Sequence, residues 1–303
     1  MNQPAAIVTQ QLTKSYGPVR ALKGVDLEVR RGEIMGFLGP NGAGKTTTIR
    51  CLLDLIRPDG GTVRVLGLDP QAQPEAVRAC CGYLPGELHL EAGLTVESAL
   101  RYLGRLRGGV EWPHVLQLAK RLDLDLKPQI KNLSKGNKQK VGVVQALMHR
   151  PELLLLDEPT SGLDPLMRRE VLRLIGEARD DGATVFFSSH VMSEVQEIAE
   201  RVAIIRAGTV VEVAATTDLA GRTLRRVAIR FREAVDASAL GRVAGVTLLS
   251  SPVGAALQLQ IEGEMDELIK AIAAFPVRDL EVERPSLEDA FVAYYGARES
   301  EGG

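Results

Sequence analysis

The chain has 303 residues, of which 45% are hydrophobic and 25% charged, and its formal net charge is −2. This composition is typical of a globular protein with one large domain or two. A net charge so close to zero supplies no strong positive field, so we expect no nucleic-acid partner.

Three further features exclude other classes of protein. No apolar stretch reaches the roughly 20 residues that a membrane-spanning helix needs, so a role in a membrane would require spanning helices from another chain. The first residues, MNQPAAIVTQQLTKSY, lack a basic segment followed by an apolar core, and we expect no signal peptide. Cys51, Cys80 and Cys81 have neither a disulfide framework nor a metal-ligand spacing, so we expect reduced, buried thiols.

The first part of the chain, to about residue 215, alternates short aliphatic runs with longer helical patterns. This alternation predicts an α/β domain with a mostly parallel sheet, whose strands are apolar throughout because both faces are buried. The predicted strands are residues 33–39, 153–157 and 183–189. The predicted helices are residues 45–56 and a helical insert beside the sheet at 95–122.

After about residue 220 the order of patterns becomes β-α-β-β-α-β, which predicts a small α+β domain of the ferredoxin-like kind. Its strands are expected at residues 224–231, 246–251, 256–263 and 277–283. Its helices are expected at 236–243 and 264–275, and a last helix at 286–296.

The stretch GPNGAGKTT, residues 39–47, fits the phosphate-binding pattern G-x-x-x-x-G-K-[ST] between a predicted strand and a predicted helix, the context this motif requires. Its glycines let the backbone curl so that N–H groups point at phosphate oxygens, and the helix N-terminus adds partial positive charge. Lys45 is expected to bridge the β- and γ-phosphates, and the Thr46 hydroxyl to bind Mg²⁺. The residues expected to contact the nucleotide are Gly39, Pro40, Asn41, Gly42, Ala43, Gly44, Lys45, Thr46 and Thr47.

The apolar run LLLLDEP, residues 153–159, places two adjacent carboxylates at the end of a predicted strand. We expect Asp157 to hold Mg²⁺, and Glu158 to orient or deprotonate the water that attacks the phosphate. Pro159 then ends the strand.

A second candidate phosphate site is LSKGNKQK, residues 133–140, where a Ser and a Gly precede a predicted helix. Together with the run VGVVQALMHRPELLLLDEPTSGLD that follows it, this stretch resembles the ATP-binding cassette (ABC) ATPases, whose signature is usually written LSGGQ. In that family the signature contacts the γ-phosphate of the other subunit, so the resemblance implies two chains sharing two Mg-ATP head to tail. The matching positions here are Ser134, Lys135, Gly136 and Asn137.

The resemblance covers about residues 5–215 and implies roles for three more residues. Tyr16 matches the aromatic residue that stacks on adenine, and Asp164, in SGLD, matches the carboxylate of the loop between the two sites. His190, in FFSSHVMSEV, matches the switch histidine that hydrogen bonds the γ-phosphate. The resemblance therefore implies that catalysis rests on Glu158, His190 and Lys45.

The chain departs from the family at two places. In GYLPGE, residues 82–87, Gly86 stands where the family has a metal-contacting Gln; we favour Glu87 in that role, although water or the shape of the loop could replace it. In the signature, Lys135 stands for a Gly and Asn137 for a Gln. Lys135 either adds positive charge near the γ-phosphate or is simply solvated.

The family implies a fold: a P-loop NTPase of ABC type, with a RecA-like core, an N-terminal β-subdomain and a helical subdomain. We expect the ATP-binding domain at residues 1–218, its helical subdomain at about 90–150, and a C-terminal accessory domain at 222–303. The terminal stretch PSLEDAFVAYY resembles the accessory domain of daunorubicin-type (ABC-2) exporter ATPases.

The predicted function is that of the ATP-hydrolysing subunit of an ABC transporter, binding ATP and Mg²⁺. It would work as a homodimer or pseudo-dimer at the cytoplasmic face of the membrane and drive separate transmembrane permease subunits, exporting a drug, antibiotic or lipid-like substrate. The docking face is expected at residues 95–122 and in the GYLPGE loop. The alternative is a cytosolic ABC ATPase that powers a partner other than a transporter.

Other nucleotide-dependent classes fit less well. GNKQKV lacks the Asp of the guanine-reading N-K-x-D motif, and the stretch from Lys45 to Ser134 is too short for the coiled coil of DNA-repair ABC ATPases. An inactive member of the family would lack Lys45 or Glu158, whereas this chain has both.

Overall fold

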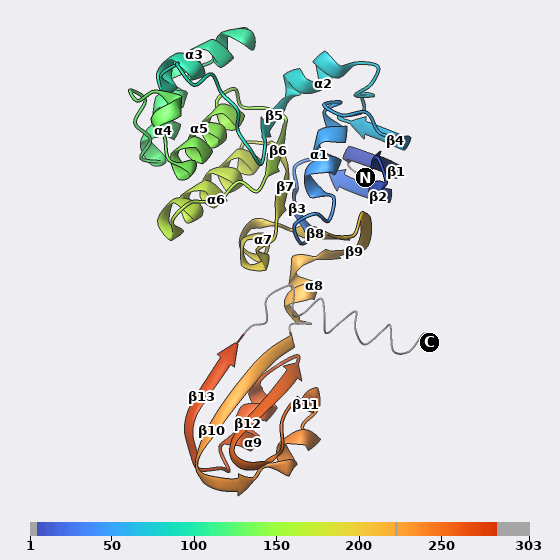
Figure 1. Cartoon of the computed structure of the whole chain (residues 1–303), viewed down its shortest axis with the longest axis vertical. Coiled ribbons are helices and arrows are strands. Elements are labelled where there is room, and N and C mark those ends of the chain that lie inside the picture. The colour runs from blue at the N-terminus through green and yellow to red at the C-terminus, as the bar shows by residue number, and fades with distance from the viewer. Residues whose placement is uncertain (1–4, 222–223, 284–303) are drawn as a thin grey trace. The chain divides into compact units, whose positions relative to one another are not determined.

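The computed structural model describes residues 5–221 and 224–283 (Figure 1). The chain divides into two compact units, with the boundary between Ala215 and Thr216. The strands of the first unit are β1 (Ala5–Tyr16), β2 (Val19–Arg30), β3 (Ile34–Leu38), β4 (Gly60–Val65), β5 (Cys81–Leu84), β6 (Leu153–Asp157), β7 (Thr184–Ser189), β8 (Arg201–Arg206) and β9 (Thr209–Ala215). Its helices are α1 (Lys45–Leu52), α2 (Pro74–Cys80), α3 (Val96–Leu106), α4 (Trp112–Arg121), the 3₁₀ helix η1 (Ile130–Asn132), α5 (Lys135–Leu147), α6 (Pro165–Asp180) and α7 (Met192–Ile198).

The larger sheet of this unit has six strands in the order β5-β6-β7-β3-β8-β9. Neighbours from β5 to β8 are parallel, and β9 is antiparallel to β8. Every residue of β3, β6 and β7 is buried, which confirms the prediction from their continuous apolar runs. Because parallel neighbours end at the same edge of a sheet, the residues that follow these three strands come together.

The smaller sheet is antiparallel, with the order β2-β1-β4. One hydrophobic cluster joins Ile7 and Leu22 of this sheet to Ile49 of α1 and to Phe37 and Phe186 of the larger sheet. The rings of Phe37 and Phe186 lie 5.1 Å apart at a tilt of 36°. Helix α1 therefore shares its core with both sheets, which fixes the loop that precedes it.

Helix α1 ends at Leu52, earlier than the predicted end at residue 56. Asp54 has a positive φ of 50°, and the N–H groups of Leu55 and Ile56 both donate to the carbonyl of Arg50. These bonds satisfy the carbonyl of Arg50 in the last turn of the helix and turn the chain away from its axis. Local periodicity did not reveal this end, because the apolar residues continue beyond it.

The predicted helical insert is confirmed as α3 and α4, which gather with α5 beyond β5, away from the three-stranded sheet (Figure 1). Thr95 caps α3 by accepting the backbone N–H of Ser98 at 3.2 Å. Helix α5 packs against both helices and against β5 and β6. It thereby connects the insert to the parallel sheet.

The second unit contains the short helix α8 (Thr216–Gly221) and an antiparallel sheet in the order β11-β12-β10-β13. Its other elements are β10 (Leu224–Asp236), the 3₁₀ helix η2 (Ser238–Arg242), β11 (Val246–Leu248), β12 (Val253–Glu262), α9 (Asp266–Ile272) and β13 (Val277–Glu283). This order of elements and strands is consistent with the predicted ferredoxin-like arrangement, although the first helix is a 3₁₀ turn. The expected helix at 286–296 lies outside the described residues.

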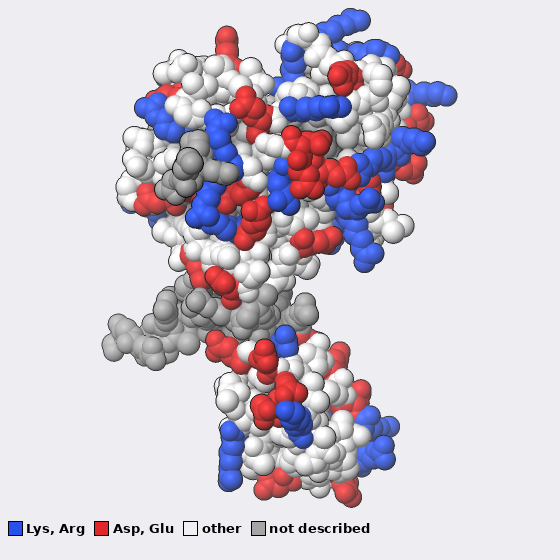
Figure 2. Space-filling view, turned by 180° about the vertical axis from the view of Figure 1, so that it is seen from behind, with Lys and Arg blue, Asp and Glu red and all other residues white. Residues whose placement is uncertain are grey.

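On the face drawn in Figure 2, basic and acidic side chains of the described residues are interspersed over each unit. This mixed surface agrees with the small net charge of the chain. The thiols of Cys51 and Cys81 are buried as expected, whereas Cys80 is only partly buried. Burial is the main reason why the pKa of each buried thiol is raised to about 12, so both are protonated and unreactive near neutral pH.

Candidate active site

The loop of residues 39–47 connects β3 to α1 and carries the first group of predicted site residues. Gly44 precedes α1 with a φ of 113°, a conformation that L side chains rarely adopt. A Cβ on Gly39 would lie 2.3 Å from the carbonyl oxygen of Ile205, so only glycine fits there. Since no side chain caps α1, its first N–H groups are available to an anion.

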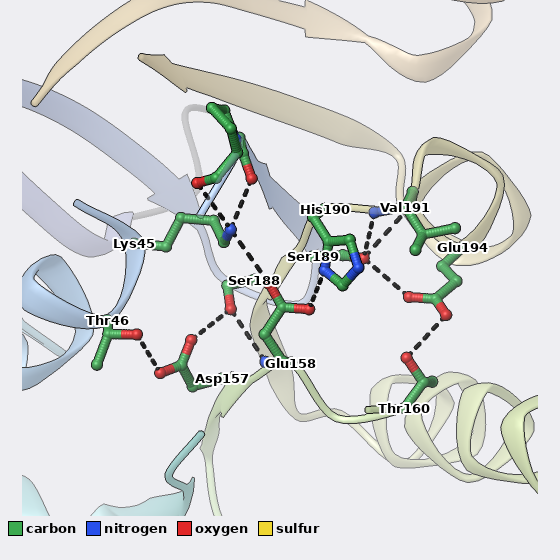
Figure 3. A network of polar contacts seen from close by, with 12 residues as sticks. Lys45, Thr46, Asp157, Glu158, Thr160, Ser188, Ser189, His190, Val191 and Glu194 are labelled. Atoms are coloured by element: carbon green, nitrogen blue, oxygen red, sulfur yellow. Dashed lines mark hydrogen bonds and ion pairs between the residues drawn. The ribbon is translucent and has the colours of Figure 1, made fainter. Parts of the chain in front are cut away.

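Lys45, the first residue of α1, folds back over this loop and is only 6% exposed. Its Nζ donates to the carbonyl oxygens of Gly39 at 2.6 Å and Pro40 at 3.3 Å. It also forms an ion pair with Glu158 Oε1 at 3.1 Å. The ammonium thus lies between the loop and the end of β6 (Figure 3).

Asp157, the last residue of β6, is fully buried and receives two hydroxyl hydrogen bonds. Thr46 Oγ1 donates to its Oδ2 at 2.6 Å, and Ser188 Oγ donates to its Oδ1 at 2.6 Å. The Ser188 oxygen also accepts the backbone N–H of Glu158 at 3.0 Å. Ser188 therefore fixes both carboxylate residues, a role that the sequence prediction missed.

Thr46 and Asp157 present a hydroxyl and a carboxylate oxygen, the hard donors that Mg²⁺ prefers. No group of three or more His, Cys, Asp or Glu arranged to hold a metal occurs among residues 5–221 and 224–283. A site with one or two protein ligands suits Mg²⁺ that is also bound to phosphate, because this ion keeps several other oxygen ligands. The residues present therefore fit a phosphate-bound Mg²⁺.

Glu158 is the centre of the polar network in Figure 3. Its Oε2 is 2.7 Å from Nδ1 of His190, while Oε1 contacts Lys45. Its backbone has a positive φ of 52°, and Gln139 Nε2 of α5 donates to its carbonyl oxygen at 2.9 Å. The structure therefore brings together all three residues predicted to be catalytic, at the end of parallel strands. Gln139, like Ser188, was not singled out from the sequence.

The signature stretch begins α5, as predicted. Ser134 is its N-cap and accepts the backbone N–H of Asn137 at 3.2 Å. Asp164 caps α6 in the same way, and hydrogen bonds from the N–H groups of Met167 and Leu166 lower the pKa of Asp164. A Cβ on Gly136 would lie 2.8 Å from the carbonyl oxygen of Gly162, so the two capped helix starts lie side by side.

Tyr16, Gly86 and Glu87 are three further residues that the sequence singled out. Tyr16 ends β1, is 47% exposed and has the Lys14 ammonium 5.8 Å from its ring centroid. Gly86 lies next to Asp157, since a Cβ on it would be 3.0 Å from Asp157 Oδ2. Glu87 is exposed and lines a cavity of about 360 Å³ with residues of β5 and α3. Its role as a metal ligand stays a prediction.

Comparisons with known proteins agree with this geometry. The family model described as "ABC transporter" matches residues 22–161. The daunorubicin/doxorubicin resistance ATP-binding protein DrrA of Streptomyces peucetius is 34% identical over 307 residues, which cover 96% of this chain and 92% of the relative. This chain belongs to the ABC transporter ATP-binding family. It is an ATPase of that family.

Other ABC proteins show the same relationship. The bacitracin transport ATP-binding protein BcrA of Enterococcus faecalis is 36% identical over 209 residues, 68% of each chain. A solved ATP-binding subunit of an ABC transporter superposes with a TM-score of 0.65 at 30% identity, covering 71% of this chain and 91% of the other. A dimeric ATP-binding cassette in a post-hydrolysis state, bound to ADP and Pi, superposes with a TM-score of 0.62 at 25% identity, covering 69% of this chain and 98% of the other.

Proposed function

We propose that the loop of residues 39–47 binds the phosphates of ATP and that Tyr16 stacks on the adenine. Two features support phosphate binding: the backbone of the loop, which requires glycine at Gly39 and Gly44, and the start of α1, which no side chain caps. Thr46 and Asp157 would hold Mg²⁺, and Glu87, the further ligand that the sequence favours, would contribute little because its side chain is exposed. Bound there, the ion would neutralise charge on the phosphates.

Hydrolysis would proceed by attack of water on the γ-phosphorus, with cleavage of the bond to the oxygen of ADP. The single observation that carries this proposal is the contact of the Glu158 carboxylate with both Lys45 and His190. Glu158 would align the water and accept its proton. Lys45 and His190 would hydrogen bond the phosphoryl oxygens as their charge redistributes, which is the main protein contribution to phosphoryl transfer.

We propose that two copies of the ATP-binding domain, residues 1–218, close head to tail around two ATP molecules. Ser134, Lys135, Gly136 and Asn137 would contact the γ-phosphate held by the facing copy, beside Asp164. The side-by-side positions of the starts of α5 and α6 support this arrangement. Cleavage of the γ-phosphate removes the shared ligand and lets the dimer open.

This cycle would drive separate transmembrane permease subunits at the cytoplasmic face of a membrane. No helix of the described residues is both long and apolar enough to cross a bilayer. Tyr102, Leu106 and Leu116 of the helical insert are exposed, and the cavity beside Glu87 opens next to α3, which supports docking on this face. The cargo would be a drug, antibiotic or lipid-like substrate, and relatives named for daunorubicin/doxorubicin resistance and bacitracin transport support export of a drug or antibiotic. Residues 222–303 would form an accessory domain.

The test is Glu158→Gln, measured for ATP turnover and for oligomeric state with ATP and Mg²⁺. We expect turnover to be lost and an ATP-dependent dimer to accumulate, because the amide keeps the shape of the site but cannot accept a proton. Glu152→Gln is the matched control, since Glu152 is exposed just before β6. Undiminished turnover in Glu158→Gln would exclude Glu158 as the base.

The transporter role is tested by co-purification with a polytopic membrane protein from the native membrane. Recovery of the chain in a complex without any membrane protein would favour the alternative, a cytosolic ABC ATPase with another kind of partner.

A further inference from the structure

Glu194, in α7, has a carboxylate that is buried within the polar network but takes no part in the proposed chemistry (Figure 3). The residue is only 3% exposed. Its Oε1 accepts the hydroxyl of Thr160 at 2.8 Å, and its Oε2 accepts the hydroxyl of Ser189 at 2.8 Å. The guanidinium Nε of Arg168 in α6 lies 3.3 Å from Oε1. A buried carboxylate with both oxygens bonded holds its neighbours in one arrangement.

These contacts join the two segments that carry Glu158 and His190. Thr160 lies two residues after Glu158, and Ser189 immediately precedes His190. Both hydroxyl-bearing residues are buried, with exposed fractions of 4% and 0%. The carboxylate of Glu194 therefore bridges Thr160, in the chain that follows β6, and Ser189, the last residue of β7.

The bridge also orders the turn on which His190 is carried. Ser189 Oγ donates to Glu194 and accepts the backbone N–H of Val191 at 2.9 Å. Because its proton is directed at Glu194, the lone pairs of this hydroxyl are free to close the turn around His190. The His190 side chain itself is 52% exposed, so packing alone does not fix it.

We propose that Glu194 is a positioning residue for ATP hydrolysis. It acts through Ser189 and Thr160 to set the position of His190 relative to Glu158, and it touches neither ATP nor the attacking water. Two oxygens are needed because two hydroxyls must be held at once. The inference rests on the roles proposed above for Glu158 and His190.

The first experiment compares Glu194→Leu, Glu194→Gln and the control Glu197→Gln, which removes an exposed charge from the same helix. Single-turnover hydrolysis, KM for ATP, ADP affinity and Tm are measured for each full-length protein. We expect Glu194→Leu to lower the hydrolysis rate about 10- to 100-fold, the effect of a small misplacement of a catalytic group. KM and ADP affinity should stay within about twofold, because the loop at residues 39–47 has no bond to Glu194.

Glu194→Gln should recover most of the rate, because its amide can accept one hydroxyl hydrogen bond and donate to the other oxygen. Glu197→Gln should match the parent protein. Parallel losses of rate, ADP affinity and Tm in Glu194→Leu would overturn the proposal, as would an unchanged rate.

The decisive comparison repeats Glu194→Leu in a His190→Ala background. If Glu194 acts through His190, adding Glu194→Leu to His190→Ala should lower the single-turnover rate less than about twofold. The effects of groups that act as a unit are not additive. The same factor in both backgrounds would refute the proposal. Should Glu194→Leu fail to fold, Ser189→Ala replaces it in this comparison. We then expect Ser189→Ala to lower the rate in the parent protein but less than about twofold in the His190→Ala background. His190→Ala alone reports on the proposed role of His190: a parental rate would sink that role, independently of Glu194.

Discussion

Gly86 lies directly against the carboxylate of Asp157: a Cβ built on Gly86 would be 3.0 Å from Asp157 Oδ2. The loop after β5 therefore reaches the proposed metal site through its backbone. The same carboxylate oxygen accepts the hydroxyl of Thr46, so a displaced Asp157 would disturb both groups expected to hold Mg²⁺.

The first prediction is that Gly86→Val lowers ATP turnover at least about tenfold and raises the Mg²⁺ concentration for half-maximal activity. A branched side chain cannot fit without moving the loop or Asp157. Gly93→Val is the control, because a Cβ there meets only Glu91 Oε1, at 3.9 Å. An unchanged Mg²⁺ dependence in Gly86→Val would mean that the loop yields without moving Asp157.

The second prediction concerns Glu87, which the sequence favours as a metal ligand. Its side chain is exposed, whereas Thr46 and Asp157 are bonded to each other at the end of β6. We therefore expect Glu87→Gln to change the Mg²⁺ concentration for half-maximal activity less than about twofold. Thr46→Ala should raise the same concentration much more. A rise in Glu87→Gln equal to that in Thr46→Ala would establish the carboxylate as a ligand.

The third prediction separates the two roles left open for Lys135. Its aliphatic stem lies over Gly162, whose Cβ would be 3.5 Å from Lys135 Cγ, so the stem rests on the loop that precedes Asp164. We expect Lys135→Ala, in the Glu158→Gln background, to weaken the ATP-dependent dimer about fivefold and to reduce its salt dependence. The exposed Lys131→Ala is the control. Equal dimerisation in both variants would make Lys135 a solvated residue.

The fourth prediction concerns stability at low pH. Burial, and secondarily the charge of Arg107, lower the pKa of His149 to about 4, and its Nε2 lies 2.9 Å from Arg107 NH1. Because this base has a depressed pKa in the folded state, its stabilising contribution is present above the unfolded value of about 6.5 and is lost as pH falls from there through 4.

His149→Gln should therefore reduce the loss of unfolding free energy between pH 7 and pH 5 by about 1 kcal/mol, a figure discounted because the ring is partly solvated. Thermal unfolding at the two pH values measures this difference. The exposed His89→Gln should keep the parental pH dependence. If His149→Gln loses as much unfolding free energy between pH 7 and pH 5 as the parent protein, other groups cause the loss.

Local patterns were sufficient for the parts of the fold that depend on local physics. Strands buried on both faces appear as continuous apolar runs, so β6 was predicted with its bounds. The Ser134 cap follows from the hydroxyl that satisfies a free N–H at a helix start. The loop of residues 39–47 was predicted between a strand and a helix because its glycines permit the backbone to curl there.

The remaining contacts connect residues that are far apart in the chain and meet only when particular strands are neighbours. Ser188 reaches Asp157 because β7 pairs with β6, and Gly86 reaches Asp157 because β5 pairs with β6. Glu194 returns from the following helix to Thr160. The sequence by itself determined which residues we expect to carry the chemistry, because backbone curvature and side-chain type are local properties. Only the tertiary structure decided which residues hold them in place, because that depends on the order of strands in the sheet.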